Sequence, residues 1–218
     1  MVDIRLIYEQ LEAAKNHLRG GSVLDYRLAL ILSDNATELL LYRELDHRFR
    51  YDDSLMPRSH PLYAEWAERV GGPKYTLEER HSAEREFDPK LRILLRLHQI
   101  SAEDRLVLGV CHRFRGSAFH RGELRRDIAE HLSKLLYVTA CHLTLKLPPR
   151  SLIWPRSPLP AVDAAFLNRF GLADAHALIT EDGQKSIVAT LLAGIEPDIN
   201  LLKELLSRDL SRAYRGND

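Results

Sequence analysis

An arginine and a histidine stand five positions apart in a cationic stretch of this chain. Arg115 precedes His120 in the segment Cys-His-Arg-Phe-Arg-Gly-Ser-Ala-Phe-His-Arg-Gly, residues 111–122. Histidine transfers protons near neutral pH, and a guanidinium can bind a phosphate whose negative charge grows in a transition state. These two groups are the minimum needed to cleave RNA without a metal ion. Arg115 and His120 are therefore our candidate catalytic residues.

Further arginines flank this pair and are candidates for binding neighbouring RNA phosphates. They are Arg113, Arg121, Arg125 and Arg126. Phosphate contacts by such residues make binding weaken as salt is added. The last of these arginines stand close to Asp127 and Glu130, so a solvated charged helix face explains some of them equally well.

Composition limits the classes of partner. Lys plus Arg and Asp plus Glu both total 31 among 218 residues, so no overall field attracts the chain to nucleic acid or membrane. An anionic ligand must therefore be bound by a local patch. Two cysteines argue against a disulfide scaffold. The N-terminus has no signal-peptide pattern, and no apolar run approaches the roughly 18 residues of a membrane span. We expect a cytoplasmic protein that does not bind membranes.

Helical periodicity recurs along the chain, and no segment alternates like a strand. We predict an all-α protein, an up-down helical bundle. The breaks are predicted at Gly20-Gly21, in a loop over 51–61, at 71–73 and in the Pro-rich segment 148–160, and Thr76 to Glu79 is predicted to form a capping box. The predicted helices cover residues 3–17, 23–48, 77–87, 91–100, 101 into the basic segment, 123–147, 162–170, 173–192 and 197–214.

Two segments resemble the HEPN superfamily of α-helical ribonucleases and RNA-associated proteins. One is the apolar helix over 26–42, which carries Asp34, Asn35 and Glu38 at its middle. The other is residues 115–120, which resemble that family's signature of an arginine, four to six further residues and a histidine. The resemblance covers about 1–147 as a HEPN-like bundle with an insert over about 50–90. It leaves 148–218 as a Pro-rich linker and C-terminal helices.

The resemblance implies a metal-independent endoribonuclease without a cofactor. His120 would remove the proton of the ribose 2′-hydroxyl or donate one to the leaving oxygen, while Arg115 stabilises the charged phosphorus centre. The supporting residues would be Asp34 and Glu38, across the bundle, and Ser117. The resemblance also implies a homodimer that joins two copies of the motif, and a toxin or defence role, with a nucleotidyltransferase-like antitoxin as partner.

Other interpretations stay open at this point. The family favours Asn, Asp or His after the motif arginine, whereas this chain has Gly116, which favours a non-catalytic HEPN module that binds RNA, nucleotide or a protein. A structural helical dimer with an interaction tail over 148–218 is a third. Arg115 itself has an alternative interpretation, as a structural salt-bridge partner of Glu38 instead of a catalytic residue. Residues five apart on a straight helix differ by about 140° in direction, so catalysis predicts a bend near Gly116 or a second subunit.

Overall fold

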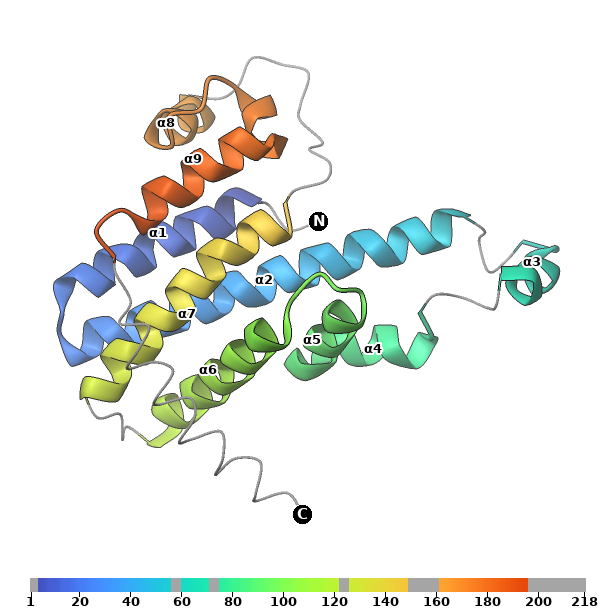
Figure 1. The fold of residues 1–218 in the computed structure, drawn as a ribbon, viewed down its shortest axis with the longest axis horizontal. Helices are drawn as coiled ribbons and strands as arrows, with labels where there is room; N and C mark the ends of the chain where they lie inside the picture. The colour runs from blue at the N-terminus through green and yellow to red at the C-terminus, as the bar shows by residue number, and fades with distance from the viewer. Residues whose placement is uncertain (1–3, 56–59, 71–74, 122–125, 149–160, 196–218) are drawn as a thin grey trace.

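The computed structural model describes residues 4–55, 60–70, 75–121, 126–148 and 161–195, and within these ranges all regular structure is helical. The prediction of an all-α helical bundle is therefore confirmed (Figure 1). The elements are α1 (Ile4–Gly20), α2 (Val23–Leu55), α3 (Tyr63–Val70), α4 (Leu77–Arg85), α5 (Phe87–Arg96), α6 (Ala102–Arg121), α7 (Arg126–Lys146), α8 (Ala161–Arg169), the 3₁₀ helix η1 (Ala175–Ile179) and α9 (Glu181–Leu192). None of the described helices is both long enough and apolar enough to cross a membrane.

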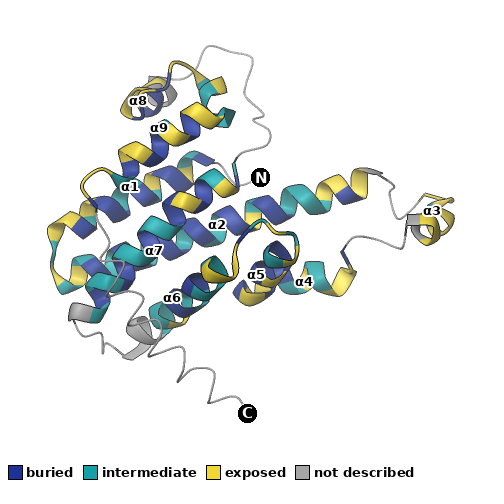
Figure 2. Ribbon diagram, in the orientation of Figure 1, coloured by how far each residue is buried: buried dark blue, intermediate teal, exposed yellow. Residues whose placement is uncertain are grey.

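The long helix α2 is the axis of the bundle. Helices α1, α6 and α7 pack along it, α9 packs on α1 and α7, and α4 and α5 lie beside its C-terminal half (Figure 1). Its buried stripe includes Leu30, Leu40 and Leu41. Figure 2 shows this burial pattern, with the dark blue residues turned inward on the helices around α2. A helix packed on several sides places its middle residues inside the protein, where an ionised group needs a partner.

Helix α2 extends seven residues beyond its predicted end, so the prediction of a loop from residue 51 is wrong. No Gly or Pro interrupts Tyr51 to Leu55, and tertiary contacts hold this extension. Arg80 of α4 places Nη2 2.6 Å from Asp52 and Nη1 2.8 Å from Asp53. Part of the predicted insert over 50–90 is thereby fastened to α2 through α4.

Helix caps agree with the sequence in two places. The Thr76 hydroxyl accepts from the backbone N–H of Glu79, and the Glu79 carboxylate accepts from that of Thr76, which confirms the predicted capping box. Ser101 and Asp104 exchange the same pair of hydrogen bonds at the start of α6. Each reciprocal pair satisfies two donors that the first turn of a helix leaves without partners.

The helix predicted over 173–192 is two elements. Thr180 ends η1 and caps α9, because its hydroxyl accepts from the backbone N–H of Gly183. A Cβ atom on Gly183 would lie 1.8 Å from the carbonyl oxygen of Ala177, so glycine is required where the chain turns back on itself. Helix α5 begins at Phe87 rather than 91, with Pro89 accommodated in its first turn. The helix predicted over 197–214 lies outside the described residues.

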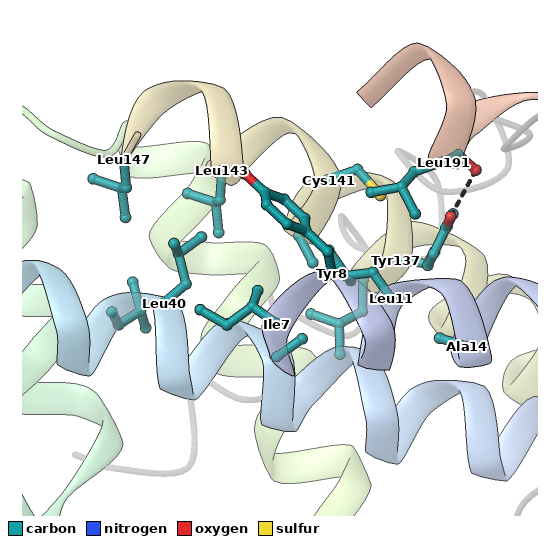
Figure 3. Close-up of a cluster of buried hydrophobic side chains, with 14 of the residues drawn as sticks. Ile7, Tyr8, Leu11, Ala14, Leu40, Tyr137, Cys141, Leu143, Leu147 and Leu191 are labelled. Atoms are coloured by element: carbon teal, nitrogen blue, oxygen red, sulfur yellow. Dashed lines mark hydrogen bonds between the residues drawn. The ribbon is translucent and has the colours of Figure 1, made fainter. Parts of the chain in front are cut away.

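The C-terminal helices share the core of the N-terminal bundle. Tyr8 of α1 packs on Phe166 and Phe170, with ring centroids 6.2 and 6.0 Å away, and donates a 2.6 Å hydrogen bond to Gln184. Tyr137 of α7 donates to the carbonyl oxygen of Leu191 at 2.6 Å (Figure 3). The described residues 161–195 thus complete the packing of α1 and α7.

Candidate functional site

A buried carboxylate stands at the middle of α2 and faces α6. The side chain of Asp34 has 0% exposure, and among the described residues two basic side chains of α6 reach it. His112 Nδ1 lies 3.0 and 3.1 Å from the two Asp34 oxygens, and Arg115 Nε lies 2.9 Å from Oδ2. Burying a carboxylate costs free energy unless it is paired, and this double pairing explains how a core helix carries an aspartate.

Arg115 is held by α2 but is only partly enclosed. Its Nε is close enough to Asp34 for an ion pair but lacks the angle of a hydrogen bond, and Nη2 donates to Asn35 Oδ1 at 3.4 Å. The side chain remains 31% exposed. The structure therefore places two of the sequence-selected residues, Asp34 and Arg115, in contact, with part of the guanidinium open to solvent.

Sequence analysis attached no role to His112. The ring lies parallel to that of Phe87 of α5, with centroids 4.0 Å apart and planes 4° apart, and the side chain is 28% exposed. A histidine three residues before Arg115 shares its helix face, and that spacing was the available signal. The contact with Phe87 depends on tertiary packing and had no signal in the sequence.

Glu38 belongs to a separate ion pair. It lies one turn after Asp34 on α2, and its Oε1 accepts from Lys90 Nζ of α5 at 3.1 Å. Lys90 is 2% exposed and also donates to the carbonyl oxygen of Glu86. The interpretation of Arg115 as the salt-bridge partner of Glu38 is therefore wrong, because α5 supplies a nearer cation. We call the residues Asp34, Glu38, Phe87, Lys90, His112 and Arg115 the α2–α5–α6 junction.

Helix α6 runs unbroken from Ala102 to Arg121, so the bend expected near Gly116 is absent. A Cβ atom on Gly116 would meet nothing within 4 Å, so packing does not require glycine there. On an uninterrupted helix, positions 115 and 120 point about 140° apart. His120 and Ser117 belong to this helix, but their side chains lie outside the described part of the structure.

The flanking arginines are described only in part. Arg113 is an exposed residue of α6. Arg125 lies outside the described residues. Arg121 is the last residue of α6 and Arg126 the first of α7, but their side chains are not described. No phosphate-binding row can be assembled from them, and their predicted role stays a prediction.

The two cysteines are core residues. Cys111 and Cys141 are both buried, and burial raises the pKa of each thiol, that of Cys141 to about 12. A protonated thiol is a poor metal ligand and a poor nucleophile. Within the described ranges, no three His, Cys, Asp or Glu side chains gather as a metal site would require.

Comparisons of the chain with protein-family models, with curated proteins and with solved structures give no match. The resemblance to the HEPN superfamily therefore rests on the residue patterns over 26–42 and 115–120.

Proposed function

We propose that this chain is a metal-independent endoribonuclease of the HEPN type, with Arg115 as the phosphate-binding residue and His120 as a proton-transferring residue. One observation carries the proposal. The acidic residue at the middle of the second helix, Asp34, is fully buried and holds the motif arginine, which stays 31% exposed. An arginine fixed by a buried carboxylate is pre-organised, so little conformational entropy is lost when it binds a phosphate.

The reaction would use the RNA 2′-hydroxyl as nucleophile. Its proton is removed, the 2′-oxygen bonds to phosphorus, and the bond from phosphorus to the 5′-oxygen breaks. His120 takes part as base or as acid, and Arg115 stabilises the extra negative charge on the phosphorane-like centre. The products are a 2′,3′-cyclic phosphate and a 5′-hydroxyl. DNA lacks the nucleophile and would not be cut.

The proposal includes a homodimer, because positions 115 and 120 of the continuous helix α6 point about 140° apart within one chain. Two copies of the motif in one interface would bring the arginine of one subunit near the histidine of the other. The resemblance adds a toxin or defence role, with RNA as target and a nucleotidyltransferase-like antitoxin as partner.

The test is cleavage of a labelled structured RNA in EDTA by the wild type and by His120→Ala. We expect EDTA-resistant cutting with cyclic-phosphate ends, reduced by about 10²–10⁴-fold in the variant. His142→Ala is a matched control, because His142 is an exposed helical histidine of α7. Full activity of a folded His120→Ala protein would contradict the assignment.

A second candidate is a non-catalytic module that binds RNA, nucleotide or a protein partner. The observation that favours it is Gly116, which follows the motif arginine where the HEPN superfamily favours Asn, Asp or His. In that case RNA binding would weaken with salt while no product formed. Filter binding of the same labelled RNA, measured beside the cleavage reaction, separates the two candidates.

A further inference from the structure

A second imidazole of the same chain, that of His112, lies on the helix face of Arg115. Residues three apart on an α-helix differ by about 60° in direction and about 4.5 Å in rise, so His112 and Arg115 share a face. Both side chains contact the carboxylate of Asp34. By contrast, position 120 points about 140° away from position 115 on the same unbroken helix. The described residues thus combine Arg115 with His112.

The imidazole of His112 is held in a defined orientation. Asp34 accepts from Nδ1, and the Phe87 ring, at 4.0 Å and nearly parallel, fixes the plane. With the proton of the neutral ring on Nδ1, the lone pair is on Nε2. Among the described residues, Nε2 of His112 has no hydrogen-bond partner, and the side chain is 28% exposed. A carboxylate that accepts a hydrogen bond from Nδ1 fixes the tautomer in which the opposite nitrogen can accept a proton.

We infer that His112 is a second catalytic residue of the proposed ribonuclease, acting through Nε2 as the general base on the ribose 2′-hydroxyl. The inference rests on the proposed function and deepens it, because it divides the two proton transfers between two histidines. Asp34 is then a positioning residue for both His112 and Arg115. The substrate class is a single-stranded or looped RNA phosphodiester, since the 2′-hydroxyl must be able to approach Nε2.

The proton balance closes with these groups. The 2′-hydroxyl proton moves to His112 Nε2 as the bond from the 2′-oxygen to phosphorus forms. The bond from phosphorus to the 5′-oxygen breaks, and the 5′-oxygen receives a proton from the His120 that a second subunit brings into the same site. His112 leaves the reaction protonated, with its positive charge balanced by Asp34, and returns its proton to water. Among the described residues, the charged groups at this site are Arg115 from α6 and Asp34 from α2, and the uncharged ones include Asn35 from α2 and Phe87 from α5.

The decisive variant is His112→Asn. The asparagine amide can still donate to Asp34 from about the position of Nδ1, but the side chain has nothing at the position of Nε2. A histidine that only supports Asp34 should therefore be replaced by asparagine with little loss. A histidine that accepts a proton should not. His142→Asn makes the same change at an exposed helical position of α7 and is the matched control.

Two RNA substrates distinguish base from acid. One carries the normal 5′-oxygen at the cleaved linkage, and the other carries sulfur there, a leaving group that departs without protonation. We expect His112→Asn to lose about 10²–10⁴-fold in cleavage rate on both substrates. We expect His120→Ala to lose a similar factor on the oxygen substrate and to recover on the sulfur substrate. His142→Asn should match the wild type on both.

The outcomes separate the two proposals. If the wild type cuts and folded His112→Asn keeps its rate within about threefold, the inference fails while the ribonuclease proposal stands. Recovery of His112→Asn on the sulfur substrate would make His112 an acid and would equally overturn it. If the folded wild type cuts neither RNA, both proposals fail together. Far-UV circular dichroism and thermal unfolding of each variant show whether a loss of rate reflects a loss of fold, and His112→Gln provides a second variant if His112→Asn does not fold.

Discussion

The contact of α9 with α1 and α7 and the α2–α5–α6 junction bury polar groups in different ways. At the first, neutral hydrogen bonds or bonds to backbone carbonyls close an apolar core, as in Tyr8 with Gln184 and Tyr137 with Leu191. At the second, Asp34 and Glu38 are ionisable residues on successive turns of one helix. Asp34 pairs with two basic side chains of α6, and Glu38 pairs with Lys90 of α5. Two side chains of the second region remain partly exposed to solvent, His112 at 28% and Arg115 at 31%.

This difference indicates that the two regions have different roles, one in stability and the other in the proposed reaction. Replacing a buried ion pair by apolar residues often leaves stability unchanged or higher. The ion pairs of the junction are therefore not the most stabilising way to pack three helices together. An apolar contact like that between α9 and α1 would hold the three helices together without buried charges. The charges at the junction instead orient one guanidinium and one imidazole toward a part of the surface that solvent reaches. We therefore assign stability mainly to the first region and the proposed reaction to the second.

The largest effect on stability is expected from the first region. Phe166→Ala should lower the free energy of unfolding by about 3–5 kcal/mol, because it opens a cavity between Tyr8 and Phe170. Urea denaturation measures the loss. Tyr51→Ala, at an exposed site on α2, should change it by no more than about 0.5 kcal/mol. A loss below about 1 kcal/mol at Phe166 would show that α8 adds little to the core.

The next effect is expected at the junction and should appear in rate. Arg115→Ala should reduce RNA cleavage by about 10²–10³-fold, the usual cost of removing one group that stabilises transition-state charge. Stability should fall less, since Asp34 keeps its bond to His112. Arg92→Ala, which removes an exposed arginine of α5, is the control. If the rate falls only in proportion to the fraction of the variant that is unfolded, Arg115 contributes to stability and not to the reaction.

Alkaline pH should destabilise the fold in part through two buried phenols of the first region, Tyr8 and Tyr137. Burial raises the pKa of Tyr8 and Tyr137 well above the ordinary value near 10. Because the folded state keeps these protons longer than the unfolded state, the contribution of the two phenols to stability is complete below pH 10 and falls as pH rises above it. Each tyrosine contributes a slope of about 1.4 kcal/mol per pH unit. Denaturant midpoints between pH 9 and 12 measure the slope, and a flat profile would contradict the burial of both phenols.

A smaller loss is expected from a single hydrogen bond in the same region. Tyr137→Phe should cost about 1–3 kcal/mol, because the carbonyl oxygen of Leu191 loses its donor inside the protein. Tyr42→Phe, at a partly exposed site, should be nearly neutral. Differential scanning calorimetry compares the two. Equal Tm values for both variants would mean that water donates to the carbonyl oxygen of Leu191 in place of Tyr137, and that solvent reaches this contact.

Much of the fold could be predicted because it is local. Apolar residues at helical spacing gave the positions of α1, α6 and α7, and the pattern Thr76-Leu-Glu-Glu79 gave the start of α4. The end of α2 could not be predicted, since Asp52 and Asp53 are held in a helix by Arg80, which is distant in sequence. Tertiary ion pairs of this kind leave no periodic signal.

The candidate site could be predicted only in part for the same reason. Asp34 was identified because a carboxylate in an apolar helix needs a partner, and Arg115 because of its motif. The partner of Glu38 was assigned wrongly, since Lys90 lies in a helix whose packing against α2 the sequence does not specify. His112 was missed because its significance comes from the contact with Phe87 and Asp34 rather than from its neighbours in sequence.

If the α2–α5–α6 junction orients groups for attack by an RNA 2′-hydroxyl, as proposed, cleavage must depend on that hydroxyl. The most direct measurement uses a labelled oligonucleotide with one ribonucleotide in a DNA strand, and the same strand with a 2′-O-methyl group there, both incubated with wild-type protein in EDTA. We predict one cut after the ribonucleotide, ending in a 2′,3′-cyclic phosphate, and no cut in the methylated strand. Equal cutting of both strands, or no cutting of either by folded protein across several sequence contexts, would contradict the account.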